Sequence, residues 1–79
     1  MPAPHCRFAL DTTTSPDVLL RVLTLLRRRG CDIVAVEYLR EDRHGPGRFE
    51  VGVEAPVRVA HRLREWLGGL VDVLAVREG

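Results

Sequence analysis

Four segments of the chain have the apolar pattern of a β-strand. In residues 5–11 and 48–54, apolar and polar side chains alternate with a period of two, which is typical of strands with one buried face. Residues 31–39 are rich in β-branched and aromatic side chains, and residues 71–77 form a shorter run of the same kind. We therefore expect four strands, the last of them beginning at Val71.

The segment 15–29 has the spacing of a helix. Its apolar residues cover a wide face, and a narrow polar stripe runs along the rest. The stripe consists of Asp17, Arg21, Thr24 and Arg28. Ser15 is predicted to cap the helix, with Pro16 in its first position and Asp17 in its first turn, and Gly30 is predicted to end it in a left-handed conformation. So wide an apolar face needs a sheet to cover it, and we expect Leu23 to lie in the core.

A second helix is predicted from Pro56 to the glycine pair at 68–69. The order of elements is then βαββαβ, which predicts an α+β, ferredoxin-like sandwich: a four-stranded antiparallel sheet with two helices on one face. Right-handed crossovers place the first and third strands at the centre and leave the second and fourth at the edges. The length of 79 residues allows one domain, residues 1–79, of which 1–4 are expected to be a loose leader.

The second strand is unusually apolar for an edge. Simple alternation places Val34, Val36 and Tyr38 on one side. It places Ile33, Ala35 and Leu39 on the other side. Because an exposed apolar edge pairs readily with another chain, we predict a homodimer whose interface includes Val34, Val36 and Tyr38.

Composition excludes several classes of protein. A formal net charge of +1 gives no electrostatic argument for nucleic acid or an anionic membrane as a partner. No apolar run is long enough to span a bilayer and no secretory leader is present, so the expected compartment is the cytoplasm. The two cysteines, Cys6 and Cys31, have neither the number of a disulfide framework nor the spacing of a metal site, so no metal is expected.

Nothing in the sequence predicts a catalytic residue. No serine, cysteine or histidine lies in a motif that would activate a nucleophile, so the chain does not read as an enzyme. An RNA-recognition module shares the βαββαβ order but stacks bases on aromatic residues of its central strands. Phe8 and Phe49 are in phase with the core positions instead, which argues against that class.

One group of polar residues suggests a site for a free amino acid between subunits. Thr14 and Ser15 lie at the predicted helix start, where backbone amides favour a carboxylate. Asp32, followed by Ile33 in the next strand, could receive an ammonium group. The alternative reading, a capped helix entry and a polar strand end, remains open.

Three segments resemble the ACT domain of the acetolactate (acetohydroxyacid) synthase small subunit. They are residues 15–23 (SPDVLLRVL), 29–33 (RGCDI) and 70–76 (LVDVLAV). The resemblance implies an ACT fold that dimerises and activates a catalytic large subunit, which carries thiamine diphosphate and acts in branched-chain amino-acid synthesis. No cofactor is then expected in this chain.

Many members of that family respond to valine through residues that align with Thr14, Asp17 and Asp32. This chain departs from the family pattern at all three. It therefore resembles most the short, single-domain type that activates the synthase with little or no valine response. The alternative is a free-standing homodimer that senses a branched-chain amino acid.

Overall fold

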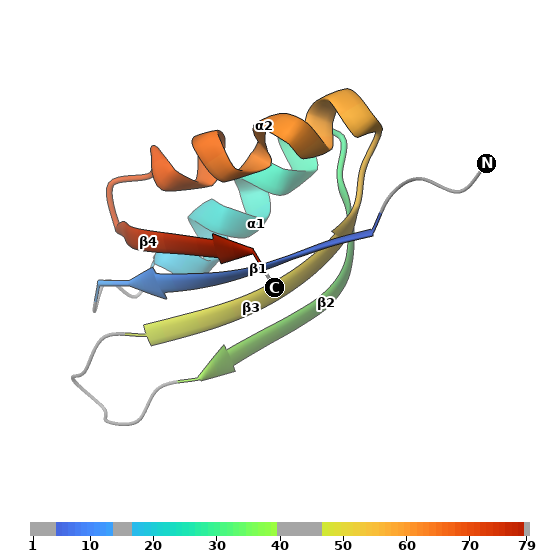
Figure 1. Ribbon diagram of the computed structural model, residues 1–79. Helices are drawn as coiled ribbons and strands as arrows, with labels where there is room; N and C mark the ends of the chain where they lie inside the picture. The colour runs from blue at the N-terminus through green and yellow to red at the C-terminus, as the bar shows by residue number, and fades with distance from the viewer. Residues whose placement is uncertain (1–4, 14–16, 40–46, 79) are drawn as a thin grey trace.

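Six elements follow one another in the computed structural model, which describes residues 5–13, 17–39 and 47–78 (Figure 1). Their order is βαββαβ, as the sequence predicts. The elements are β1 (His5–Thr12), α1 (Val18–Arg28), β2 (Asp32–Leu39), β3 (Gly47–Glu54), α2 (Val57–Gly68) and β4 (Val73–Glu78). The predicted leader, residues 1–4, lies outside the described residues.

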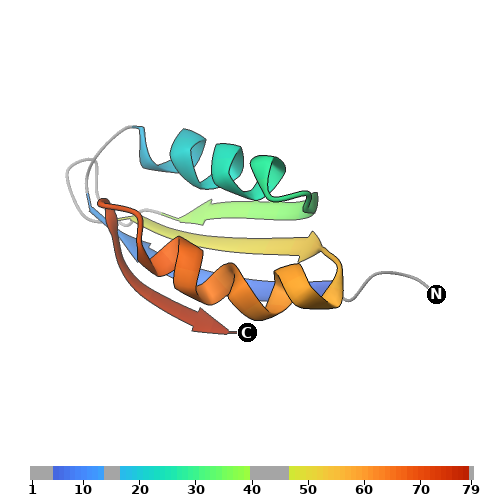
Figure 2. The same ribbon diagram turned by 90° about the horizontal axis from the view of Figure 1, so that it is seen from above.

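The four strands form one antiparallel sheet in the order β2-β3-β1-β4. The first and third strands are central and the second and fourth are edges, which confirms the prediction from right-handed crossovers. Both helices lie on one face of the sheet and run in opposite directions (Figures 1 and 2). The fold is the predicted ferredoxin-like sandwich.

Helix α1 faces the sheet through residues spaced four apart. Val18, Val22 and Leu26 are buried, and this spacing keeps them on one side of the helix. Gly30 has a φ of +82°, the left-handed conformation predicted for the residue that ends the helix. The helix begins at Val18, so Asp17 stands at its N-cap and not in its first turn. The predicted cap Ser15 and the predicted first residue Pro16 lie outside the described residues.

The apolar face of α1 is narrower than the sequence suggests. Leu23 is half-buried and does not belong to the buried core, and Leu20 is 67% exposed. The expectation that Leu23 lies in the core is wrong, because its position on the helix is turned away from the line of Val22 and Leu26. Part of the apolar surface of α1 therefore stays open beside the sheet.

Helix α2 packs on the sheet through Leu63 and Leu67. The single tryptophan of the chain, Trp66, joins it to the end of α1, because the Arg29 guanidinium carbon lies 4.2 Å from the centre of the indole ring. The Arg62 guanidinium lies 5.1 Å from the same ring. Two cations thus flank one aromatic side chain where the two helices meet.

The core lies between the central strands and the helices. Its buried apolar residues are Phe8, Leu10, Val18, Val22, Leu26, Cys31, Phe49, Val51, Val53, Ala55, Leu63, Leu67 and Val73. Phe8 and Phe49 are therefore unavailable for stacking bases, in keeping with the argument against an RNA-recognition module. No residue of β2 is part of this buried set.

Helix length gives one further result. Among the described residues, no helix is long and apolar enough to cross a membrane.

Candidate effector and dimerisation surfaces

Strand β2 exposes the three residues predicted for the dimer interface. The exposed fractions are 48% for Val34, 42% for Val36 and 40% for Tyr38. Within the described residues β2 pairs with β3 alone, so its outer edge presents backbone donors and acceptors beside these apolar side chains.

A bulge in β2 changes which residues share a face. The register with β3 shifts between Ile33 and Ala35, so Val34 is an extra residue without an opposite partner. Ile33, Val36 and Tyr38 lie opposite core residues of β3 and therefore point to the helix side of the sheet. Those partners are Val53, Val51 and Phe49. The expectation that Ile33 lies on the other side from Val36 and Tyr38 is wrong, because alternation does not continue through a bulge.

The ring of Tyr38 is fixed by two residues of β3. Its centre lies 4.6 Å from that of the Phe49 ring. It also covers Gly47, where an added Cβ would come within 2.6 Å of a Tyr38 ring carbon. The absence of a Cβ at Gly47 therefore leaves room for the Tyr38 ring, while Tyr38 remains 40% exposed to solvent.

The predicted effector residues are only partly described. Asp32 is exposed, and its carboxylate lies 3.8 Å from the guanidinium of Arg27 at the end of α1. Ile33 is half-buried and packs against the core. Thr14 and Ser15 lie outside the described residues.

The topology separates the two halves of the predicted effector site within one protomer. Strands β1 and β2 are both antiparallel to β3, so they run in the same direction. The end of β1 and the following residue Thr13 therefore lie at the opposite end of the sheet from Asp32, which begins β2. A single protomer does not bring the helix start and Asp32 together.

A polar network that the sequence analysis missed lies beside Thr13. Its backbone N–H donates to the Asp72 carbonyl at 2.9 Å, and its hydroxyl donates to the Asp72 carboxylate at 3.1 Å. Arg21 donates to the other oxygen of that carboxylate at 2.6 Å. Asp72 lies in the turn before β4, which begins at Val73 and not at the predicted Val71. The sequence did not predict this turn, because the apolar residues Leu70 and Val71 continue the pattern of the following strand.

The open face of the sheet carries a second cluster of charges. Asp11 on β1 accepts hydrogen bonds from Arg48 on β3 and Arg77 on β4, each at 3.0 Å. The three residues belong to three neighbouring strands, so the cluster ties one end of the sheet together. Asp11 retains only 34% of its side-chain exposure.

The two cysteines behave as small apolar residues. Burial raises the pKa of the Cys31 thiol, and the nearby Cys6 and Asp32 raise it further. The thiol form is therefore favoured at neutral pH, which suits a buried side chain. Among residues 5–13, 17–39 and 47–78, no three side chains of the metal-binding types come together.

Comparison with known proteins identifies the fold. No family model matches the sequence, and no curated protein matches it. Among solved structures, the ACT domain from the GTP pyrophosphokinase of Chlorobium tepidum is similar over 98% of this chain and 99% of that domain, with a TM-score of 0.79 and 9% identity.

A homoserine dehydrogenase from Thiobacillus denitrificans is also similar, with a TM-score of 0.67 and 14% identity. The match covers 98% of this chain but only 17% of the dehydrogenase. At these identities the likeness establishes the fold: the chain has the architecture of an ACT domain.

Proposed function

We propose that the protein is a non-catalytic regulatory domain that acts as a homodimer paired through β2. The observation that carries this proposal is an ACT-type fold whose β2 edge exposes Val34, Val36 and Tyr38. Such an edge is stable in water when another chain covers it. Light scattering at micromolar concentration should give twice the mass of the chain, and a monomer would contradict the proposal.

Dimerisation supplies the geometry that an amino-acid site needs. If two β2 strands pair antiparallel about a twofold axis, the Asp32 end of one strand meets the Leu39 end of the other. The α1 start of each protomer lies at its own Leu39 end, because α1 follows β1. A carboxylate at the helix start and an ammonium group at the partner's Asp32 end would then belong to one ligand.

The partner proposed for this dimer is the large subunit of acetolactate synthase. The support is the resemblance of residues 15–23, 29–33 and 70–76 to the small subunit of that enzyme. Activation would be a binding free energy that favours the active state of the large subunit, whose cofactor would be thiamine diphosphate. The test is the activity of the purified large subunit with and without this chain. Co-purification and a rise in activity are expected, and no interaction would remove this partner.

A free-standing sensor of a branched-chain amino acid is the alternative. The exposed Asp32, available to an ammonium group, favours it. Calorimetry with valine, leucine and isoleucine separates the two functions. Heat of binding in the absence of a large subunit supports the sensor, whereas activation without such heat supports the accessory subunit.

A further inference from the structure

The two layers of the molecule differ in charge. Seven arginines and two carboxylates lie in residues 17–30 and 56–69, which contain both helices. The four strands carry three arginines and six carboxylates. The near-neutral total therefore hides a basic helix layer above an acidic sheet.

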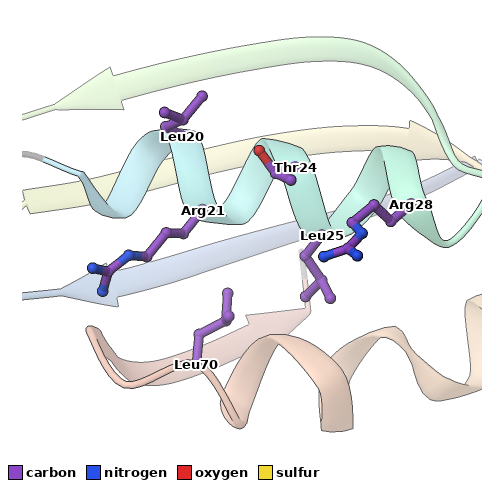
Figure 3. Close-up of a pocket in the computed structure, with 6 residues that line it drawn as sticks. All are labelled: Leu20, Arg21, Thr24, Leu25, Arg28 and Leu70. Carbon is purple, nitrogen blue, oxygen red and sulfur yellow. The ribbon is translucent and has the colours of Figure 1, made fainter.

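A hollow of about 340 Å³ lies on the basic layer, along the flank of α1 (Figure 3). Its lining residues are Leu20, Arg21, Thr24, Leu25, Arg28 and Leu70. Figure 3 shows Arg21 and Leu25 pointing from α1 towards the side of Leu70, and Thr24 between the two arginines along the helix. The hollow thus combines an apolar wall with two guanidinium groups.

The two arginines of the hollow lie on the same side of α1. Arg21 and Arg28 are seven residues apart, so they lie on one side of the helix about 10 Å apart along its axis. Thr24 between them is short and has a hydroxyl donor. Figure 3 shows the Arg28 guanidinium turned towards Leu25, whereas the Arg21 side chain extends along the helix away from Arg28. A carboxylate in the hollow beside Leu25 would therefore meet the Arg28 guanidinium.

The two arginines differ in their partners. Arg21 is held by Asp72, whose carboxylate is 14% exposed and is itself bonded by Thr13. Arg28 makes no ion pair within the part of the chain that the structure describes. Arg21 is therefore a fixed donor, whereas Arg28 has no ionic partner among the described residues.

We propose that this hollow docks an acidic segment of a partner protein. A carboxylate of the segment pairs with Arg28, and an apolar side chain next to it packs on Leu25 and Leu70. Charge complementarity selects this occupant, because the helix layer as a whole attracts negative charge. The acidic sheet of a second copy is a poorer occupant, since helix-on-sheet stacking is head-to-tail and does not close.

None of the residues that line the hollow lies on β2. Docking at the hollow rests on the proposed function only for the name of the partner, the large subunit of a synthase. The hollow and its charges are features of this chain alone, so they can be tested without that subunit.

The first test uses a short synthetic peptide of glutamates with two central leucines, followed by NMR of the isotope-labelled full chain. Amide signals of Arg21, Thr24, Arg28 and Leu70 should shift on titration. Arg28→Glu should weaken binding about tenfold, whereas Arg28→Lys should retain most of it. The matched control is Arg58→Glu, which makes the same charge change on α2 outside the hollow and should weaken binding less than about threefold.

Three results would overturn the proposal. They are no shifts with the peptide, shifts centred on other residues, and equal weakening by Arg28→Glu and Arg58→Glu, which would mean attraction to net charge only. Self-association that Arg28→Glu abolishes would assign the hollow to a second copy instead.

The second test uses the large subunit of acetolactate synthase. If the unaltered chain binds it, Arg28→Glu should weaken binding and activation about tenfold, and Arg58→Glu should not. If Arg28→Glu leaves binding unchanged, the large subunit does not dock at the hollow. Absence of binding by the unaltered chain contradicts the proposed function, while the peptide test still decides the inference.

Discussion

The two edge strands of the sheet, β2 and β4, differ in how well they are protected against pairing with another chain. β4 is short, six residues, and it ends in the charged pair Arg77 and Glu78, with Arg77 bonded to Asp11. β2 has eight residues and one carboxylate beyond its first residue, Glu37, among apolar side chains. Short length and charge protect an edge from pairing, and β2 is the longer of the two strands and has a single charged residue after Asp32. By these criteria β2 is less protected against pairing than β4, which is why the proposed dimer uses β2.

The helices also cover β4 more completely than β2. β4 contributes the buried Val73 to the core and lies beside α2 (Figure 1). β2 contributes no buried residue, and the neighbouring flank of α1 leaves Leu20 open and Leu23 half-buried. The Arg27–Asp32 pair shows that this flank faces β2, because Arg27 is four residues from Leu23. Both β2 and the neighbouring side of α1 therefore leave apolar side chains exposed to solvent.

The strongest test of this comparison places a charge on each edge. Val36→Lys should abolish the dimer at micromolar concentration, because it would place an ammonium group within the proposed interface. Leu74→Lys, at a residue that is 65% exposed in β4, should leave the dimer intact. Analytical ultracentrifugation measures both variants. Equal effects of the two substitutions would end the distinction between the edges.

Truncations on α1 compare the core with the flank beside β2. Leu26→Ala should lower the free energy of unfolding by about 2–5 kcal/mol, because Leu26 is fully buried. Leu23→Ala should cost about 1 kcal/mol in the monomer, since that side chain is only half-buried. Urea unfolding at several protein concentrations measures both. If the flank joins the interface, the cost of Leu23→Ala rises with concentration, and a constant cost would exclude Leu23 from it.

Gly47 tests how far Tyr38 organises the end of β2. Gly47→Ala should cost about 1–3 kcal/mol, because the new Cβ would displace the Tyr38 ring. Gly68→Ala is the matched control: its Cβ would meet only Val76, at an ordinary 3.8 Å, and it should be neutral or slightly stabilising. Thermal unfolding compares the two. A neutral Gly47→Ala would mean that Tyr38 moves aside freely.

The smallest effect is expected at the charged cluster that includes β4. Arg77→Ala should cost at most about 1 kcal/mol, because its pair with Asp11 is partly open to water. The loss should shrink in high salt. Urea unfolding at low and high ionic strength measures it. A large loss that is independent of salt would show that the pair contributes more than surface electrostatics.

The sequence predicted the six elements and the sheet order because periodicity and chain connection determine both. It missed features that depend on single contacts between distant residues. The bulge at Val34 interrupts alternation and becomes visible only against the register of β3. The sequence predicted Asp72 to lie in the last strand. In the structure it lies in the turn before β4 and accepts hydrogen bonds from Thr13 and Arg21.

The predicted effector site also depends on contacts that local sequence patterns do not reveal. Polar residues at a helix start and at the beginning of a strand can be recognised from the sequence. The distance between the helix start and Asp32 depends instead on the relative direction of β1 and β2. That direction separates them within one protomer. Only a pairing of two chains could unite them, and a single sequence does not encode the geometry of such a pair in any local pattern.

The contacts of Trp66 with Arg29 and Arg62 allow folding to be followed by intrinsic fluorescence. The only indole of the chain contacts the guanidinium groups of Arg29 and Arg62, whereas the only phenol, Tyr38, lies on β2 against Phe49. Fluorescence emission of Trp66 should change when its contacts with Arg29 and Arg62 are lost during denaturation. Ultraviolet absorption of Tyr38 should register the arrival of a neighbour at the outer strand, so folding and association can be monitored in one sample without a label.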